Sequence, residues 1–299
     1  MKRILALTLG VCLLSVSLQA AADRPKRRLR PWPTFKGAEA RVYKKIGEVK
    51  LRLHIFKPAD WKKSDRRPAI VFFFGGGWTG GSPAQFEQQA RYLASRGMVA
   101  MSAEYRIRGR HGTTPDKCVA DGKSAVRWIR AHAGELGIDP HRIVASGGSA
   151  GGHVAACTGI VKGLDEPGED TAVSSVPNAL VLFNPAVDLL IIPKNRRIGK
   201  LLGDHARELS PLQHVRKGLP PTIIFHGTAD TAVPFESVQR FQRAMTKAGN
   251  RCELIPFKGQ QHGFFNFTRS RKNYNATMRR TDQFLRSLGY LKGRPTIGE

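Results

Sequence analysis

The chain has 299 residues, which suits one large α/β domain or two small ones. Hydrophobic residues make up 41% of it, enough to build a sizeable core and typical of a globular protein. Lysine and arginine total 49 against 23 acidic residues, and the net charge of +26 favours contact with anionic surfaces such as cell wall or acidic glycans. These charges are dispersed and accompanied by no nucleic-acid-binding motif, so we expect no nucleic-acid partner.

Cysteine content excludes two further classes. Outside the N-terminal apolar stretch, the chain has only Cys118, Cys157 and Cys252, which allow one internal bridge at most and exclude a disulfide scaffold. No pair has CxxC spacing, so we expect no metal site, and no motif for a nucleotide cofactor is present. The three thiols are expected to be small buried hydrophobes.

The first 22 residues have the pattern of a secretory signal peptide. A basic start at Met1-Lys2-Arg3 precedes an apolar stretch from Ile4 to Leu18, and small residues at 20–22 form an A-x-A cleavage site. The alternative, a membrane anchor, would need a longer apolar run. We therefore expect export to the periplasm or medium, with cleavage before Asp23. That step would lower the net charge from +26 to +24 and leave no transmembrane segment in the mature chain.

Beyond the signal, strand and helix patterns alternate. The basic, proline-rich stretch at 23–40 is typical of an extended tail or linker. In chain order, the patterns then predict a strand at 49–56, a strand at 69–74, a helix at 83–95, a strand at 97–103, a helix at 116–132, a strand at 142–145, a helix from about Val154, a strand at 179–183, a mixed insertion at 188–218, a strand at 222–225, a helix at 234–248, a strand at 252–257 and a helix at 273–288.

This alternation predicts an α/β protein with a mostly parallel sheet. In such sheets the ligand crevice lies beyond the carboxyl ends of the strands. Four polar or glycine-rich sites follow predicted strands: the glycines at 75–77, Ser149, Asp230 and His262. Each is a weak signal alone, but their shared placement predicts one functional site.

Ser149 lies in the motif Gly147-x-Ser149-x-Gly151, between a predicted strand and a predicted helix. That context is typical of a nucleophile elbow, in which a strained turn exposes a serine at the end of a strand. A serine hydroxyl becomes a good nucleophile only when a base removes its proton and an acid orients that base. Asp230 and His262 follow Ser149 in the chain order that this arrangement has in α/β-hydrolases.

From about Lys50 to Leu288, the chain resembles an α/β-hydrolase of the esterase/lipase branch, close to the hormone-sensitive-lipase and small acetyl-esterase groups. The resemblance rests on four segments: GGGW at 75–78, GGSAGG at 147–152, HGTADTAVP at 226–234 and HGFFN at 262–266. It implies an α/β-hydrolase fold at 41–293, with a central, mostly parallel eight-stranded sheet flanked by helices.

The resemblance also implies residue roles. Ser149 would be the nucleophile, His262 the general base and acid, and Asp230 the residue that orients His262. Backbone N–H groups of Ala150, Gly76 and Gly77 would form the oxyanion hole. The family's glycine run usually opens with histidine, and Phe74 occupies that position here.

Structural alternatives remain open for each residue. Ser149 could be a helix N-cap, and His262 a buried structural histidine. Asp230 could be a turn residue, with Asp188 as the alternative acid. Trp78 could line the substrate pocket or only pack the loop, and His153 is expected to be a packing residue.

These features predict a secreted serine carboxylic-ester hydrolase. The short insertion at 188–218 favours small acyl groups, and acetylated xylan or feruloyl esters fit export and the resemblance. One alternative is a peptidase similar to prolyl oligopeptidases, although the chain leaves no room for their propeller domain. The other is a non-catalytic, surface-binding protein with the same fold.

Overall fold

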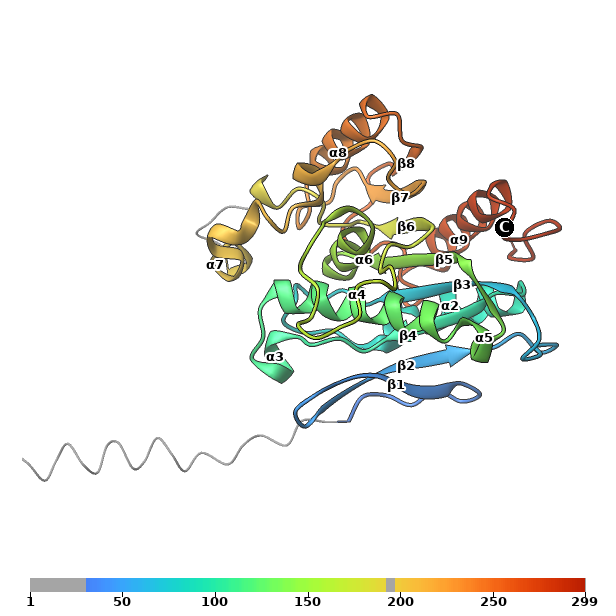
Figure 1. The fold of residues 1–299 in the computed structure, drawn as a ribbon. Helices are drawn as coiled ribbons and strands as arrows, with labels where there is room; N and C mark the ends of the chain where they lie inside the picture. Colours follow the sequence, from blue (N-terminus) through green and yellow to red (C-terminus); the bar gives the residue numbers. More distant parts are fainter. Residues whose placement is uncertain (1–30, 192–196, 299) are drawn as a thin grey trace, which may run out of the picture. The chain divides into compact units, whose positions relative to one another are not determined.

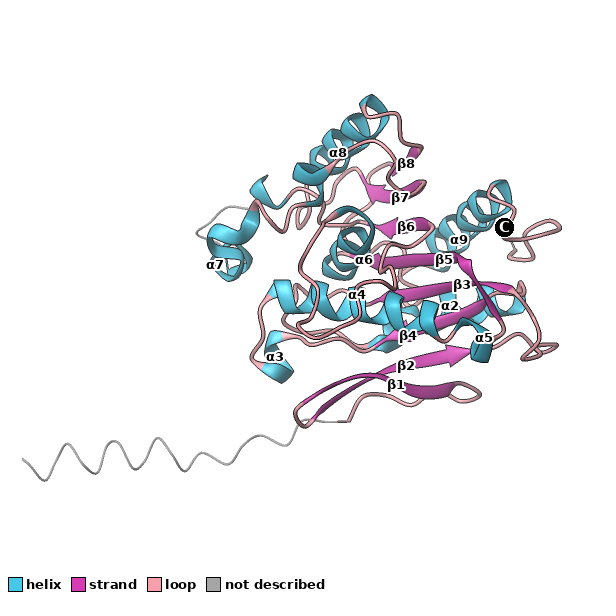
Figure 2. Ribbon diagram, viewed as in Figure 1, coloured by secondary structure: helices cyan, strands magenta, loops and turns pink. Residues whose placement is uncertain are grey.

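The computed structural model describes residues 31–191 and 197–298. A compact unit begins at Trp32 and contains one eight-stranded sheet with the strand order β1-β2-β4-β3-β5-β6-β7-β8. Figure 2 shows the strands stacked in this order, from β1 at the bottom of the view to β8 at the top. The strands are β1 (Glu39–Ile46), β2 (Val49–Phe56), β3 (Arg67–Phe73), β4 (Val99–Ala103), β5 (Ile138–Gly148), β6 (Ala179–Phe183), β7 (Thr222–Gly227) and β8 (Cys252–Phe257).

All neighbouring strands from β4 to β8 pair in parallel, whereas β2 pairs antiparallel with both β1 and β4. Parallel pairing of successive strands requires crossover connections, and helices supply them. The predicted fold class, an α/β-hydrolase fold with a mostly parallel eight-stranded sheet, is therefore confirmed.

Helices cover both faces of the sheet (Figure 1). They are α2 (Glu87–Ser95), α3 (Arg108–His111), α4 (Pro115–Ala131), α5 (Ala133–Leu136), α6 (Ala150–Ile160), α7 (Arg197–Leu202), α8 (Phe235–Lys247) and α9 (Arg271–Ser287). Short 3₁₀ turns are η1 (Pro83–Phe86), η2 (Leu189–Ile191), η3 (Gly203–Ala206) and η4 (Pro211–His214). The insertion expected at 188–218 thus consists of short helical pieces in its described part.

The core has two layers because side chains alternate between the faces of a strand. In β3, Val71 and Phe73 pack in the layer that also contains α4, α6 and α8. Ile70 and Phe72 face the opposite layer, which contains α2 and α9. The continuous apolar run of this strand follows from burial on both faces.

The N-terminal boundary differs from the prediction. The expected signal peptide and the first part of the expected tail lie outside the described residues. The second part of the segment 23–40 belongs to the compact unit, because Phe35 is 8% exposed and its ring lies 4.8 Å from that of His54. Aromatic packing onto β2 therefore holds a segment that its proline and charge content predicted to be a tail.

Two negative findings concern the described residues. The cysteines Cys118, Cys157 and Cys252 are free thiols, the first two buried and the third partly buried. Within the described ranges, no helix has the length and apolarity needed to cross a bilayer.

Candidate active site

Ser149 lies at the sharp turn between β5 and α6. Its φ of 56° and ψ of −121° fall in a region that residues with a side chain rarely adopt. A Cβ on Gly147 would lie 2.4 Å from the carbonyl oxygen of Gly151, and a Cβ on Gly151 would lie 2.1 Å from that of Phe73. The two glycines therefore allow α6 to start close against β3, which forces the turn that presents Ser149 to the cavity beyond the sheet.

The imidazole of His262 lies between Ser149 and Asp230. Its Nε2 is 2.9 Å from the Oγ of Ser149, and its Nδ1 is 2.7 Å from the Oδ2 of Asp230. Residues 113 and 32 positions apart in the chain are thus joined in one line of hydrogen bonds. With Nδ1–H donating to the carboxylate, Nε2 is free to accept the hydroxyl proton of the serine.

The carboxylate of Asp230 is buried yet held in its charged form. Burial opposes ionisation, but hydrogen bonds from His262 and from the Val233 N–H outweigh it, so the pKa of Asp230 lies below its usual value. Its Oδ1 accepts the N–H groups of Ala232 and Val233, each at 2.9 Å. These bonds fix the carboxylate and leave Oδ2 to orient His262.

The alternatives for these residues do not match the geometry. The side chain of Ser149 does not cap α6, and the half-buried His262 lines a cavity rather than the core. Asp188 has its Oδ2 2.8 Å from the Nη1 of Arg240, so it pairs with α8 rather than with His262. Asp230 is the acid that contacts the histidine.

The glycine loop after β3 presents unpaired N–H groups to the same cavity. The Gly75 N–H donates to the Oε1 of Gln85 at 2.6 Å, whereas the Gly76 carbonyl accepts from Thr79 and Gly80. In the described part of the chain, no acceptor is bonded to the N–H of Gly76 or Gly77. The N–H of Ala150, the first residue of α6, also lacks an acceptor, as is general for the first turn of a helix. These are the three donors predicted for an oxyanion.

The cavity in front of Ser149 has a volume of about 320 Å³. Its wall includes apolar side chains from five different segments: Trp78, Ala186, Ile198, Val233 and Phe265. Small-molecule sites generally have about 300–1,000 Å³, so this one is at the small end of the range. Among the described residues, no group of three His, Cys, Asp or Glu could hold a metal ion.

Comparison with known proteins places the chain in a family. A family model described as BD-FAE matches residues 53–245, more than half of the chain. The chain belongs to the BD-FAE family of α/β-hydrolase esterases. Apo esterase 2 of Thermogutta terrifontis is 56% identical and superposes with a TM-score of 0.85, covering 89% of this chain and 100% of its own.

More distant curated relatives agree with this assignment of the BD-FAE chain. A probable isoprenylcysteine alpha-carbonyl methylesterase of Arabidopsis thaliana is 28% identical over 71% of the chain and 48% of its own length. Esterase LipC of Mycobacterium tuberculosis is 28% identical over 68% of the chain and 56% of its own length. The chain thus spans about half the length of these two curated relatives.

In this BD-FAE family member, aromatic packing occupies the place of the usual histidine before the glycine run. The ring of Phe74 stacks on that of Tyr105 at 4.3 Å and 25°, and the Tyr105 hydroxyl donates to the Phe74 carbonyl at 2.5 Å. The loop start is therefore held by a stack and a backbone hydrogen bond. The change to phenylalanine leaves the unpaired N–H groups of Gly76 and Gly77 in place.

Trp78 both lines the cavity and packs the glycine loop, the two roles considered from the sequence. It is 2% exposed, with a φ of 58°, and it forms part of the cavity wall. Its Nε1–H donates to the Nδ1 of His153 at 3.2 Å, and the Nε2 of His153 lies 2.7 Å from the Leu209 carbonyl. His153 is therefore a neutral imidazole with its proton on Nε2, which ties the glycine loop to the segment after η3.

We expect His153 to make stability depend on pH. Burial lowers its pKa from 6.5 to about 4, so between these values the unfolded chain binds a proton that the native BD-FAE fold does not. The free energy of unfolding should thus fall as pH drops through this window, by about 3 kcal/mol, and level off below pH 4. Urea denaturation at pH 7, 6, 5 and 4.5 measures this fall in the free energy of unfolding.

The matched comparison is His153→Gln against His141→Gln on the exposed surface. Only the former should lose this part of the pH dependence. If both variants keep the slope of the parent chain, His153 does not titrate as stated.

Two residues that were assigned no role from the sequence connect the halves of this BD-FAE site. Gln85 donates from Nε2 to the Oδ1 of Asn266 at 3.0 Å, and the Nδ2 of Asn266 donates to the Gly263 carbonyl at 2.8 Å. With its bond to Gly75, Gln85 thereby couples the glycine loop to the His262 loop. A lone glutamine in a predicted helix carries no signal of this role, whereas Asn266 lies inside the recognised HGFFN segment.

Proposed function

We propose that this protein is a serine carboxylesterase acting through Ser149, His262 and Asp230. The observation that carries the proposal is the unbroken line of hydrogen bonds from Asp230 to Ser149, which ends in a small cavity beside three unpaired N–H groups. Membership in an esterase family supports it. The curated relatives are longer, so the activity itself is our inference.

In the first step, the Oγ of Ser149 attacks the ester carbonyl while His262 accepts its proton. The carbonyl oxygen becomes an oxyanion, stabilised by the N–H groups of Ala150, Gly76 and Gly77. The tetrahedral adduct collapses, and His262 returns the proton to the departing alcohol. Water, deprotonated by His262, then attacks the acyl-serine, and the proton passes back to Ser149 as the acid leaves.

We further propose that the acyl group is short. A cavity of about 320 Å³ with an apolar wall suits acetyl to butyryl groups better than a fatty acyl chain. Thermogutta terrifontis Est2, 56% identical to this chain, has been solved with propionate bound and with butyrate bound. Acetyl groups on a polysaccharide such as xylan are a fitting natural source, and feruloyl esters are the larger alternative.

An ester series tests chain length. We expect kcat/KM for 4-nitrophenyl esters to be highest at acetyl to butyryl and at least about 100-fold lower at palmitoyl, because an acyl chain longer than the cavity displaces the ester carbonyl from its reacting position at Ser149. Initial rates below the micelle-forming concentration of the long ester measure this. An equal or higher value for palmitate would contradict the short-acyl assignment.

Two rival functions have distinct outcomes. A non-catalytic surface-binding protein would remain unlabelled by a fluorophosphonate probe, although folded. For the esterase, intact mass spectrometry should show one probe per chain, and none for Ser149→Ala. Thermogutta terrifontis esterase 2 has been solved phosphorylated by paraoxon, which supports this choice of probe. A peptidase would instead cleave proline-containing 4-nitroanilides, for which we expect no Ser149-dependent turnover.

We also propose export through the signal at residues 1–22. The basic start, apolar stretch and small residues before Asp23 support it. N-terminal sequencing of protein recovered from the periplasm or medium should find Asp23 as the first residue. An intact N-terminus on cell-associated protein would overturn export with cleavage.

A further inference from the structure

A second cavity adjoins the one that contains Ser149. Its volume is about 750 Å³, and it shares Gly76, Gly77 and Ile198 with the smaller cavity. A substrate whose ester carbonyl lies at Ser149 can therefore extend past the glycine loop into this outer space. The outer cavity has more space than an acetyl or butyryl group occupies.

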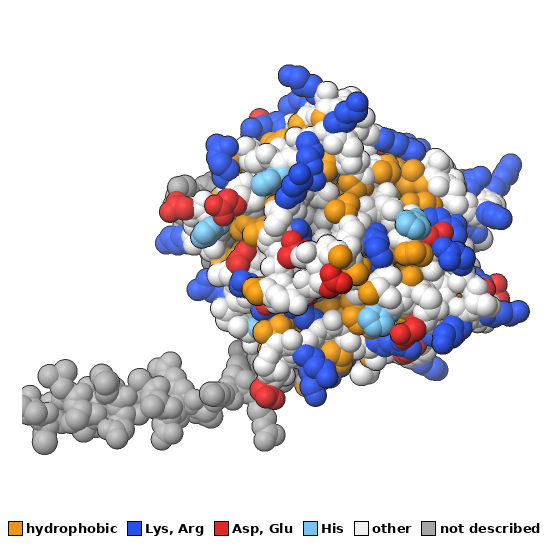
Figure 3. All heavy atoms as spheres, in the orientation of Figure 1, with side chains coloured by type: hydrophobic (Ala, Val, Ile, Leu, Met, Phe, Trp, Pro, Cys, Tyr) orange, Lys and Arg blue, Asp and Glu red, His pale blue; other side chains and the backbone are white. Residues whose placement is uncertain are grey.

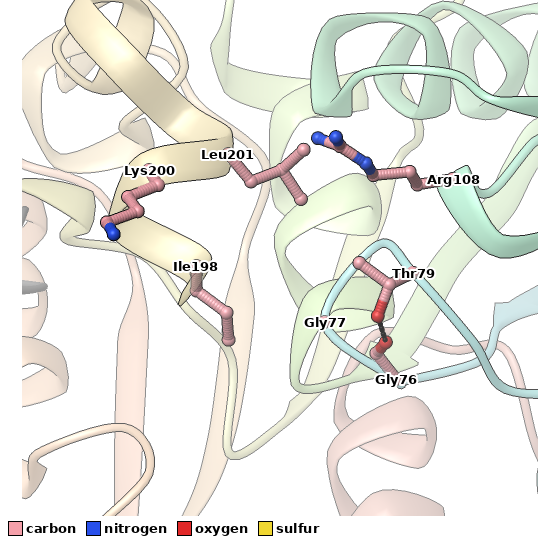
Figure 4. Close-up of a pocket in the computed structure, with 7 residues that line it drawn as sticks. All are labelled: Gly76, Gly77, Thr79, Arg108, Ile198, Lys200 and Leu201. Carbon is pink, nitrogen blue, oxygen red and sulfur yellow. Dashed lines mark hydrogen bonds between the residues drawn. The ribbon is translucent and has the colours of Figure 1, made fainter. Parts of the chain in front are cut away.

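The charged residues lining the outer cavity are both basic: Arg108 from α3 and Lys200 from α7. Figure 4 shows the guanidinium of Arg108 extending toward Leu201, whereas the side chain of Lys200, on the other wall, points away from Arg108. The described residues that line the outer cavity include no carboxylate. Two exposed cations in a concave site whose described lining includes no acid attract an anion.

The position of Arg108 is coupled to the proposed oxyanion loop. The backbone N–H of Arg108 donates to the Trp78 carbonyl at 2.8 Å, and the backbone N–H of Gly109 donates to the Thr79 carbonyl at 2.9 Å. The start of α3 is thus bonded to the turn that presents Gly76 and Gly77. The backbone at Arg108 is therefore held at a fixed place relative to Gly76 and Gly77, and its side chain reaches the outer cavity from there.

We propose that the preferred substrates are esters carrying a carboxylate on the part that projects into the outer cavity, where Arg108 binds it and the charge of Lys200 adds to the attraction. Acylated acidic sugars belong to this class. The inference rests on the proposed esterase function and names its substrate. The guanidinium fork suits a carboxylate, and the apolar side chains of Ile198 and Leu201 suit the carbon skeleton that carries it.

The surface as a whole is also basic, and Figure 3 shows Lys and Arg side chains spread over the visible face. A general field would favour any anion, with little dependence on single residues. If the site is local, the preference for anionic esters depends instead on the side chains of Arg108 and Lys200. A control substitution far from the cavity separates these cases, and Lys63, exposed in the loop that leads into β3 at the opposite end of that strand, provides it.

The experiment compares kcat/KM for matched ester pairs. The pair 4-acetoxybenzoate and 4-acetoxybenzamide places the charge on the alcohol side. The 4-nitrophenyl monoester of adipic acid and its neutral amide analogue place it on the acyl side. We expect the charged member to be favoured at least about tenfold in one pair, and the ratio to fall in 0.5 M NaCl because salt screens exposed charges.

We expect Arg108→Gln to lower this ratio about fivefold, Lys200→Gln about threefold, and the double variant to abolish the preference, whereas Lys63→Gln leaves it unchanged. Arg108→Lys should retain part of it, because the charge remains while the fork is lost. Equal turnover of both members of each pair, or an equal loss in Lys63→Gln, overturns the proposal. Failure of the esterase function is distinguishable, since neutral esters would then show no Ser149-dependent turnover.

Discussion

Ser149→Ala should lower kcat for 4-nitrophenyl butyrate by a factor of about 10⁴–10⁶, because removal of a triad nucleophile leaves only the contributions of binding and the oxyanion hole. The hydroxyl accounts for this loss and not the fold, since alanine adds no atom to the tightly packed turn. The measurement is steady-state hydrolysis at saturating ester, with far-UV circular dichroism to verify folding.

Ser95→Ala is the matched control. Its hydroxyl is exposed on α2 and bonded only to the Tyr92 carbonyl, on the layer of the sheet opposite to α6. We expect its kcat within twofold of the parent value. A Ser149→Ala variant that retains a tenth of the parent activity would end the proposed mechanism.

Asp230→Asn carries the second largest expected effect, a fall in kcat of about 10⁴. An amide can present its NH₂ group to the Nδ1 of His262, which then keeps its proton on Nε2 and cannot accept one from Ser149. The present carboxylate prevents this tautomer, because its Oδ2 lies 2.7 Å from Nδ1 and its Oδ1 is occupied by two backbone N–H groups. Steady-state kinetics at pH 7 to 9 measure the loss.

Asp188→Asn is the informative comparison, because the sequence also allowed Asp188 to be the acid that orients His262. It is 2% exposed and pairs with Arg240, so its replacement should lower the thermal midpoint while kcat of the folded fraction stays within about tenfold. Loss of kcat equal to that of Asp230→Asn, in folded protein, would reassign the acid.

Much of the fold was predictable because its signals are local. The apolar run at 69–74 predicted a strand buried on both faces, and the structure places β3 at Arg67–Phe73 between two helical layers. Most helix ends were displaced by one or two residues, but α6 begins at Ala150, before the predicted start at about Val154, and the expected helix at 83–95 is divided into η1 and α2. Pro83 and the Ser82 cap start that segment as a 3₁₀ turn, a detail that apolar periodicity does not encode.

The predicted boundary at the N-terminus was wrong because it depends on contacts between residues distant in the sequence. Proline and basic charge at 23–40 indicated a tail, but Phe35 and Trp32 find aromatic partners in residues far along the chain. A segment with a few anchoring rings folds with the sheet even when its composition is that of a linker. Such partners cannot be identified from local sequence composition, because they come together only when the sheet forms.

By itself, the sequence determined the mostly parallel sheet and the strained turn at Ser149, because periodicity and glycine spacing reflect backbone needs within a few residues. The order of the recognised segments added His262 and left Asp230 and Asp188 as candidate acids. The tertiary structure decided that Asp230 rather than Asp188 contacts His262, that Gln85 takes the Gly75 N–H and leaves those of Gly76 and Gly77 unpaired, and that Arg108 and Lys200 line one cavity. Each of these depends on distances between segments far apart in the chain, which only packing of the whole sheet and its helices sets.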